Sequence, residues 1–319
     1  MQPAYKILRV DDTHPLLDES LREKGWQVDV DLTSPVEKIM HKIGQYDGLI
    51  IRSRFPVDQK FLEKAHNLKF ICRVGSGLDN IDKTEAQKRN IQLINTPEGN
   101  ADAVGELAVG LLISLLRHIP QADREIRQGM WNRFTHTGTE IQGKTIGLIG
   151  YGNTGKAFAK KLSGFGTEII FYDILPGLGD DYAKQVEMDE IFERSDILSL
   201  HIPLDESTRY LVNKNFLSSF KKPIYLLNTS RGPIVKTEDL ADMIQKGKVL
   251  GAGLDVLEHE KTAFQNEVWD MDKLPEDLRY LLQSDKVVFT PHIGALTRES
   301  YERLARVATE KIIRFLEGG

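Results

Sequence analysis

Cysteine is almost absent from this sequence: Cys72 is the single one in 319 residues, so no disulfide can form within the chain. A composition without disulfides is typical of a reducing compartment. Cys72 lies in a run of strand-like composition, Phe70 to Val74, so we expect a packed thiol rather than a reactive one. The N-terminus carries Lys6 and Arg9 without the apolar segment of a secretion signal. These features predict a cytoplasmic protein.

Long uncharged hydrophobic runs are also missing. The most apolar stretch, residues 101–119, contains Asp102, Glu106 and Arg117 and falls short of the ~18 uncharged residues of a membrane span. Positive charge is not in excess, because 42 Lys and Arg stand against 47 Asp and Glu. We therefore expect no membrane and no nucleic acid as partner, and we find no metal-ligand pattern. Any anion site must be local and built from particular arginines.

Short strand-like runs, several apolar on both faces, alternate with helical patterns in the first third of the chain. This alternation predicts a parallel sheet covered on both sides. The expected strands are residues 5–10, 28–32, 48–51, 68–74 and 91–94, with helices at 35–43, 58–65 and 82–88. The turn-rich residues 95–100 end this series, and Asn100 or Asp102 could cap the next helix, which runs to about His118. That helix is apolar around most of its circumference, which predicts burial between domains or subunits.

A second strand–helix series begins after the polar residues 121–142. Its six expected strands are residues 145–149, 168–172, 197–201, 224–228, 250–255 and 287–290, and a last helix covers 297–316. Six strands with intervening helices are typical of a doubly wound, nucleotide-binding sheet. A chain of this length is expected to form two domains.

A dinucleotide-binding fingerprint opens this second series. Gly150, Gly152 and Gly155 form the pattern G-x-G-x-x-G between an apolar strand and a helix, where the helix N-terminus faces the phosphates. Asp173 ends the next strand 18 residues later (173 − 155 = 18), close to the spacing of the acid that accepts the ribose hydroxyls. Asp173 would repel a 2′-phosphate, and Ile174 with the next residue supplies no arginine. The pattern therefore favours NAD over NADP.

Three charged residues stand at or just beyond strand ends in the same half: Arg231, Glu260 and His292. Ligands bind at this edge of such sheets. A guanidinium binds a carboxylate bidentately and can polarise a neighbouring carbonyl. A histidine can donate a proton to the new alkoxide and take it back in the reverse reaction, and a carboxylate beside the ring would orient it. The set suits hydride transfer between a 2-hydroxy acid and its 2-keto acid.

With these motifs the chain resembles the D-isomer-specific 2-hydroxyacid dehydrogenase family across nearly its full length. The resemblance implies an NAD-binding Rossmann domain at residues 99–291. It is expected to be inserted into a flavodoxin-like α/β substrate domain made of residues 1–98 and 292–319. Arg231, Glu260 and His292 correspond in order to the family's catalytic set, which implies an NAD-dependent enzyme acting at C2 of a small D-2-hydroxy acid.

Further family motifs are His201-Ile-Pro-Leu204 with Thr208, and the run from Gly75 to Asn80. Beside the glycine loop and Asp173, the resemblance assigns to the cofactor Ser76, Asn153, Thr154, Ile202, Pro203, Thr208, Thr229, Ser230, Asp255 and Gly294. There are departures: Asn153-Thr154 replaces a common Arg-Ile pair, Ile202 stands for a frequent threonine, and Lys261 follows Glu260 where proline is usual. Residues 261–285 form a longer stretch than usual, so Glu258 remains a rival for the glutamate role.

Three segments resemble the D-3-phosphoglycerate dehydrogenase branch: Arg52-Ser53, residues 95–100, and Trp131-Asn-Arg133. The resemblance implies that Arg52, Ser53, Arg73 and Gly75 contact the substrate and that Arg133 reaches it from the other subunit of a homodimer. The expected reaction converts D-3-phosphoglycerate to 3-phosphohydroxypyruvate in serine biosynthesis, in a short form without the C-terminal regulatory domain. The alternative is a glyoxylate or hydroxypyruvate reductase, or another D-2-hydroxyacid dehydrogenase.

A second class of function stays open at this point. Corepressor-like relatives use the same fold as an NAD-gated protein-binding module. The intact set of Arg231, Glu260 and His292 favours an enzyme, and a turnover assay would separate the two possibilities. The fold alone could not.

Overall fold

The computed structural model describes residues 4–260 and 269–318, which form two compact units. The central unit spans Asp102–Gly294, and the terminal unit combines Met1–Ala101 with Ala295–Gly319. The two boundaries between the units lie at 101/102 and 294/295. Each is three residues beyond the predicted boundary, at 98/99 and 291/292. Of the unusual 261–285 stretch, residues 261–268 lie outside the described part, and the rest holds η5 (Met271–Lys273) and α11 (Glu276–Gln283).

The terminal unit is built on a five-stranded parallel sheet with strand order β2-β1-β3-β4-β5. The strands are β1 (Lys6–Arg9), β2 (Gln27–Val30), β3 (Gly48–Ile51), β4 (Phe70–Arg73) and β5 (Gln92–Asn95). All five predicted strands are present. The order 2-1-3-4-5 is that of flavodoxin-like folds, as the family resemblance implied.

Both faces of this sheet carry apolar side chains, which explains why helices pack on both faces. On one face, Ile7 and Phe70 pack with residues of α1 (Leu16–Glu23) and α12 (Arg298–Leu316). On the other face, Leu8 and Leu49 pack with α2 (Val36–Lys42), η1 (Ile43–Gln45), α3 (Gln59–Leu62) and α4 (Lys83–Lys88). Helix α1 was not predicted. Helix α12, from the far end of the chain, begins where Thr297 accepts a hydrogen bond from the backbone N–H of Ser300.

The central unit holds a seven-stranded parallel sheet, with order β12-β11-β10-β9-β6-β7-β8. The strands are β6 (Thr145–Ile149), β7 (Glu168–Tyr172), β8 (Lys184–Gln185), β9 (Ile197–Leu200), β10 (Ile224–Asn228), β11 (Val249–Leu254) and β12 (Val287–Phe289). The chain starts in the middle at β6, steps outward to β8, and returns to β9 on the other side. This is the doubly wound order, with a switch point between β6 and β9. The prediction missed only β8, which has two residues.

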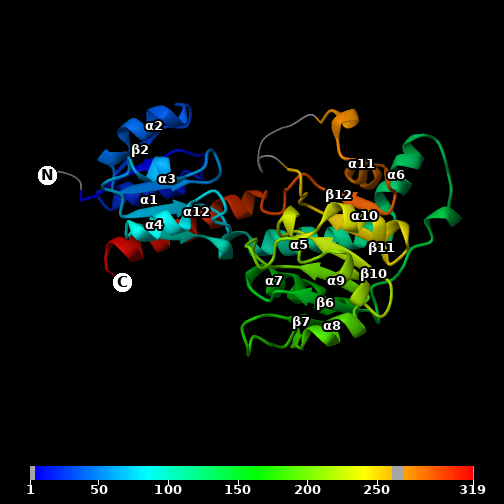
Figure 1. The fold of residues 1–319 in the computed structure, drawn as a ribbon. Helices are drawn as coiled ribbons and strands as arrows, with labels where there is room; N and C mark the ends of the chain where they lie inside the picture. The colour runs from blue at the N-terminus through cyan, green and yellow to red at the C-terminus, as the bar shows by residue number, and fades with distance from the viewer. Residues whose placement is uncertain (1–3, 261–268, 319) are drawn as a thin grey trace. The chain divides into compact units, whose positions relative to one another are not determined.

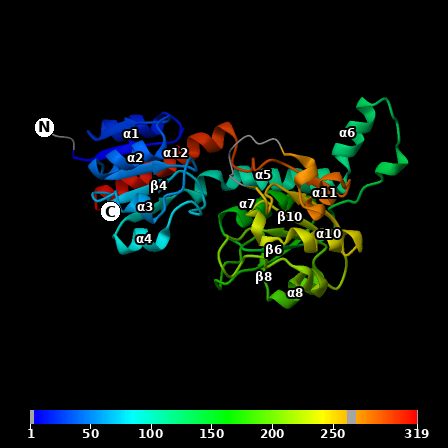
Figure 2. The same cartoon turned by 45° about the horizontal axis from the view of Figure 1, so that its top comes forward.

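Helices lie on both faces of this sheet as well. One core cluster joins α5 (Pro97–Leu116) and α7 (Asn153–Leu162) to the sheet. The opposite cluster contains residues of α8 (Met188–Arg194), α9 (Lys214–Ser219), α10 (Thr237–Gln245) and α11. Short 3-10 turns are η3 (Ser163–Phe165) and η4 (Gly232–Ile234). Helix α6 (Ile119–Arg127) and η2 (Phe134–His136) lie in residues 119–138, here called the arm, which stands out from the sheet in both ribbon views (Figures 1 and 2).

Helix α5 starts earlier than the sequence suggested. It begins at Pro97, inside the segment interpreted as a turn, rather than after Asn100 or Asp102. Proline is well suited to the first helical position, because its missing N–H would have no partner there. Within the described residues α5 is the one helix long and apolar enough to cross a membrane. Leu111, Leu112, Leu115 and Leu116 are at most 4% exposed in the core of the central unit, as in a core helix.

Candidate active site

The three candidate catalytic residues lie on neighbouring strands. Arg231 follows β10, Glu260 follows β11 and His292 follows β12, and these strands are adjacent in the sheet. All pairings between them are parallel, so the three residues emerge at the same carboxyl edge. Positions that are 61 residues apart along the chain (292 − 231 = 61) are thus brought to one side of the central unit.

The loop that carries Arg231 is shaped by the last residue of β10. Asn228 accepts a hydrogen bond from the backbone N–H of Ser230 at 3.0 Å and donates one to the carbonyl of Arg231 at 3.0 Å. The Arg231 guanidinium donates from Nη1 to the carbonyl of Ser230 at 2.7 Å. Sequence reasoning did not single out Asn228. Its signal was a buried amide that ends an otherwise apolar strand.

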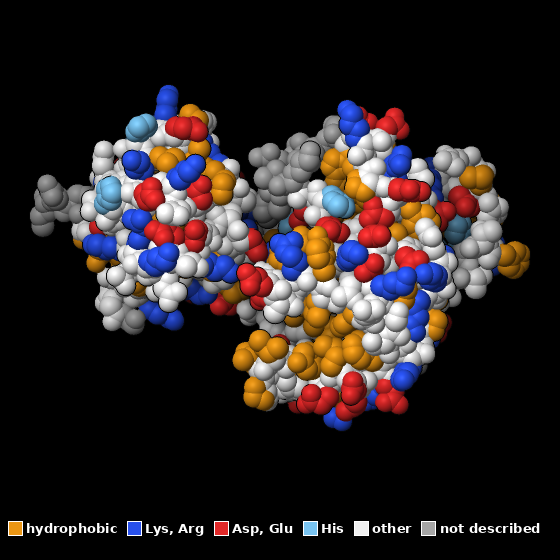
Figure 3. Space-filling model, viewed as in Figure 1, with side chains coloured by type: hydrophobic (Ala, Val, Ile, Leu, Met, Phe, Trp, Pro, Cys, Tyr) orange, Lys and Arg blue, Asp and Glu red, His pale blue; other side chains and the backbone are white. Residues whose placement is uncertain are grey.

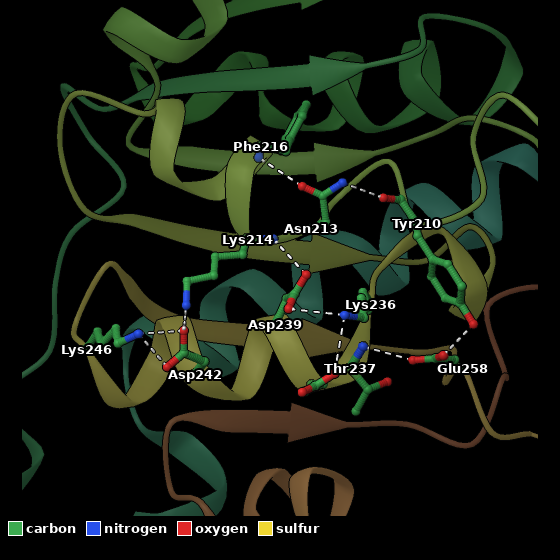
Figure 4. A network of polar contacts seen from close by, with 11 residues as sticks. Tyr210, Asn213, Lys214, Phe216, Lys236, Thr237, Asp239, Asp242, Lys246 and Glu258 are labelled. Atoms are coloured by element: carbon green, nitrogen blue, oxygen red, sulfur yellow. Dashed lines mark hydrogen bonds and ion pairs between the residues drawn. The ribbon is translucent and has the colours of Figure 1, made fainter.

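Histidine 292 is paired with Glu260 and not with Glu258. Its Nδ1 lies 3.1 Å from Glu260 Oε1 and 3.3 Å from Oε2. The pair is about four-fifths buried, with 19% and 24% of the side chains exposed. Glu258 instead accepts hydrogen bonds from the Tyr210 hydroxyl and from the backbone N–H of Thr237 (Figure 4). Of the two glutamates that the sequence left open, Glu260 is therefore the one in hydrogen-bond contact with His292.

The backbone of His292 is strained, with φ of 52°, in the left-handed region that non-glycine residues seldom occupy. Asp255 holds it there. The backbone N–H of His292 donates to the Asp255 carbonyl at 2.8 Å, and the Asp255 carboxylate accepts from the N–H groups of Ile293 and Gly294 and the hydroxyl of Thr290. Burial raises the pKa of Asp255 above its ordinary value, although these hydrogen bonds oppose the shift. Strain of this kind recurs where a side chain must be aimed for function.

The glycine loop has the geometry that a dinucleotide needs. Gly150 has φ of 89°, and a Cβ there would lie 2.5 Å from the carbonyl oxygen of His201. A Cβ on Gly155 would lie 2.6 Å from the carbonyl oxygen of Gly150, so helix α7 could not pack as closely. Gly152 has open space on its Cβ side, at the N-terminus of α7, where backbone N–H groups and the helix dipole attract phosphate.

Asp173 stands directly after β7 and braces this loop. Its carboxylate accepts hydrogen bonds from the backbone N–H groups of Tyr151 at 2.8 Å and Leu175 at 3.0 Å. Ile174 and Leu175 beside it are 85% and 59% exposed, and Figure 3 shows hydrophobic side chains gathered over this part of the unit. Neither Ile174 nor Leu175 carries a positive charge that could bind a 2′-phosphate.

The other predicted cofactor residues of the central unit also lie at carboxyl ends of strands. Asn153 and Thr154 open α7, Ile202 to Thr208 follow β9, Thr229 and Ser230 follow β10, and Asp255 and Gly294 follow β11 and β12. Within the described chain, the buried hydroxyl of Thr229 has no hydrogen-bond partner. A buried hydroxyl without a partner at this edge fits a polar ligand. The residues present are thus suited to NAD.

Five predicted residues lie elsewhere. Arg52 and Ser53 follow β3, Arg73 ends β4, and Gly75 and Ser76 follow it, all in the terminal unit. The Arg73 guanidinium donates to the carbonyl of Arg52 at 3.2 Å and lies against Gly75. The Ser76 hydroxyl donates to Asn100 at 2.6 Å.

One carboxylate that sequence reasoning missed shapes the loop after β3. A single oxygen of Asp11 accepts from the backbone N–H groups of Arg52, Ser53 and Arg54 at 2.6, 2.8 and 3.0 Å. Its signal was an acid just beyond the first strand. Asp11 therefore fixes the backbone of this loop, and the side chains of Arg52 and Ser53 take no part in these three bonds.

Arg133 lies in the exposed arm of the central unit. The arm is rich in exposed apolar side chains, with Trp131 78% and Phe134 90% exposed. Figure 3 shows hydrophobic side chains at the outer end of this segment.

Across the described residues, no group of three or more His, Cys, Asp or Glu side chains could hold a metal ion.

Comparison with known proteins agrees with this geometry. Residues 109–294 match the family described as D-isomer specific 2-hydroxyacid dehydrogenase, NAD binding domain. The chain is 40% identical to hydroxypyruvate reductase of Thermotoga maritima over 280 residues, which is 88% of each chain. It is 33% identical to D-3-phosphoglycerate dehydrogenase of Archaeoglobus fulgidus over 95% of this chain and 56% of that longer protein. It superposes on D-lactate dehydrogenase with NAD⁺ from Lactobacillus jensenii with a TM-score of 0.79, at 27% identity, over 98% and 97% of the two chains.

Proposed function

Because the chain belongs to the D-isomer specific 2-hydroxyacid dehydrogenase family and is an NAD-dependent oxidoreductase, we propose the roles of its residues and the identity of its substrate. His292 is the acid–base group, Arg231 binds the substrate carboxylate, and Glu260 orients the histidine. The observation that carries these roles is the Glu260–His292 hydrogen bond of 3.1 Å at the sheet edge where Arg231 also emerges.

When bound, NAD supplies or accepts the hydride at the C2 carbon of the substrate. Thr229 and the N-terminus of α7 lie where they could hold its polar groups, and Asp173 is placed to accept from ribose hydroxyls. In reduction, Arg231 grips the carboxylate and polarises the C2 carbonyl. His292 then donates a proton to the C2 oxygen, and the negative charge of Glu260 stabilises the protonated ring before the transfer. In oxidation the same proton returns to His292.

The proposed substrate pair is D-3-phosphoglycerate and 3-phosphohydroxypyruvate, which places the enzyme in serine biosynthesis. The support is the concentration of arginines at the strand ends of the terminal unit, since Arg52, Arg54 and Arg73 all lie within or next to the loops after β3 and β4. Arginine is suited to bind phosphate through paired N–H groups. Arg54 donates to carbonyls of Val10 and Asp31, and the residues proposed for the phosphate are Arg52 and Arg73, which the family resemblance assigns to the substrate.

The second candidate is reduction of hydroxypyruvate or glyoxylate. It is favoured by the 40% identity to the hydroxypyruvate reductase, which covers 88% of that protein. The same Arg231, Glu260 and His292 would serve, because the chemistry at C2 is unchanged. The two candidates differ in whether the group on C3 carries a phosphate.

We also propose a cytoplasmic homodimer. The arm exposes Trp131 and Phe134 almost fully, and large apolar side chains grouped in one exposed segment mark an interaction surface. A second copy that covers the arm would bring Arg133 toward the partner's substrate, as the family resemblance implies. A chain whose single cysteine is Cys72 forms no disulfide of its own, which is typical of a reducing compartment.

The decisive experiment measures kcat and KM for hydroxypyruvate, 3-phosphohydroxypyruvate, glyoxylate and pyruvate with NADH. The proposal expects 3-phosphohydroxypyruvate to have the highest kcat/KM and expects Arg52→Gln to remove that preference. A higher kcat/KM for hydroxypyruvate would instead favour the second candidate.

Variants of the central unit test the mechanism separately from the substrate. His292→Ala should lower kcat by roughly 10²- to 10⁴-fold while NADH binding, measured by fluorescence titration, stays nearly unchanged. Arg231→Lys should also lose most activity, because an ammonium cannot reproduce the guanidinium fork. Full turnover by His292→Ala would refute the proposed chemistry.

A further inference from the structure

Tyr210 occupies a strained position near the candidate active site. Its φ is 53°, in the left-handed region where a bulky aromatic residue is rare. Neighbouring polar groups hold its backbone there, because its N–H donates to the Pro233 carbonyl at 2.8 Å and its carbonyl accepts from the Asn213 amide at 2.9 Å. Such conformations persist where the surroundings over-determine them, and they cluster at functional sites.

The strained backbone aims the Tyr210 hydroxyl at Glu258. The hydroxyl donates to Glu258 Oε1 at 2.7 Å, and the backbone N–H of Thr237 donates to Oε2 at 2.8 Å (Figure 4). Burial alone would raise the pKa of Glu258, but these hydrogen bonds outweigh it and the pKa is lowered. Both oxygens of an ionised carboxylate are therefore anchored, one to the loop after β9 and one to the start of α10.

Glu258 stands two residues before Glu260 on the same short loop. The loop is also fixed from the side of Arg231, because Gly232 lies directly against its backbone. A Cβ on Gly232 would lie 2.0 Å from the carbonyl oxygen of Leu257 and 2.5 Å from the backbone nitrogen of Glu258. The loops after β9, β10 and β11 are thus locked to one another just before the chain reaches Glu260.

We propose that Tyr210 and Glu258 form a positioning pair that holds Glu260 within hydrogen-bond distance of His292. The pair also connects the loop of Pro203 and Thr208, assigned to the cofactor, with the acid–base residues. Neither Tyr210 nor Glu258 touches the reacting atoms in this proposal, which rests on the proposed function of Glu260 and His292. Glu258 thus acts through Glu260 rather than in its place.

Charged and titratable groups lie on both sides of this arrangement. Arg209 faces the Tyr210 ring, and His259 lies near Glu258. On the other side, His292 faces Glu260 and the carboxylate of Asp255. Glu260 is the carboxylate in hydrogen-bond contact with the His292 ring, so a change in this contact acts directly on the acid–base residue.

The experiment uses the full chain and compares Tyr210→Phe, Glu260→Gln and the double variant. Glu260→Gln removes the charge that stabilises the protonated ring, so the pH profile of keto-acid reduction should shift to lower pH. Tyr210→Phe removes one hydroxyl and should shift the profile in the same direction, with kcat lowered about 10-fold, less than the ~10²-fold cost of a full 1 Å misplacement. In the double variant, Tyr210→Phe should cause no further shift, because it acts through Glu260.

Tyr46→Phe is the matched control. It removes the same kind of bond, a tyrosine hydroxyl that donates to Asp29 at 2.9 Å, in the terminal unit, and it should leave the profile unchanged. A profile that Tyr210→Phe does not move, or a shift that adds fully to that of Glu260→Gln, would overturn the positioning role even if the melting temperature falls. An unmoved profile in Glu260→Gln would refute the proposed catalytic pair itself, which keeps the two failures apart.

Discussion

His201 makes the stability of the central unit sensitive to acid. It follows β9 and is 8% exposed, with its ring against Phe158 at 5.4 Å and its Nε2 at 2.9 Å from the Ser199 hydroxyl. Within the described residues its Nδ1 has no hydrogen-bond partner. Burial without a compensating carboxylate lowers the pKa of His201 to about 3.

The magnitude follows from the difference between the folded and unfolded chain. The unfolded histidine takes up a proton below about pH 6.5, whereas the folded one stays neutral until about pH 3, so acid favours unfolding between these values. At pH 5 the difference spans roughly 1.5 pH units, and at about 1.36 kcal/mol per unit it removes about 2 kcal/mol of stability. For a domain of 150–250 residues this corresponds to a fall in melting temperature of roughly 4–8 °C.

The assay is thermal unfolding of the wild type and of His201→Gln at pH 7.5 and at pH 5. Glutamine can keep a hydrogen bond to Ser199 but takes up no proton, so the wild type should lose about 2 kcal/mol more than the variant over this range. His41→Gln, at an exposed site of α2, is the control and should behave like the wild type. An equal loss in wild type and His201→Gln would refute the reasoning, because other groups would then explain the whole acid effect.

Three further outcomes are expected. Asp173→Ala should raise the kcat/KM ratio of NADPH to NADH, because it removes the charge that repels a 2′-phosphate; an unchanged ratio would contradict that role. Gly155→Ala should weaken NADH binding and lower the melting temperature, since its Cβ would lie 2.6 Å from a backbone carbonyl, and wild-type values for both would show that the loop can adjust. Replacing Trp131 and Phe134 together by serine should convert the proposed dimer to monomer in sedimentation velocity; a wild type that is already monomeric at micromolar concentration would remove the proposed dimer.

Local patterns in the sequence determined much of the architecture and most of the candidate site. Eleven of the twelve strands in the described residues could be recognised as short apolar runs, because strands buried on both faces leave that mark wherever they lie in the chain. The same marks placed Arg231 and His292 at strand ends. The carboxyl ends of parallel strands share one edge, so their grouping could be expected before their spatial neighbours were known.

Elements whose existence depends on distant partners escaped this reasoning. The two residues of β8 form a strand only because β7 lies beside them, and α5 could begin at Pro97 where a turn also suited the sequence. Asn228 and Asp11 looked like ordinary strand-end polar residues. Each shapes a loop by accepting hydrogen bonds from particular backbone N–H groups. For Asp11 these groups are more than 40 residues away along the chain (52 − 11 = 41).

The choice between Glu258 and Glu260 shows most directly what only the tertiary structure could decide. The two glutamates are two residues apart in one loop, so no periodicity or composition separates them. Tyr210, 48 residues earlier, takes Glu258, and His292, 32 residues later, takes Glu260. Local sequence predicts which side chains are charged and where strands end, but a hydrogen-bond partner is chosen by the packing of loops that meet only in the folded chain.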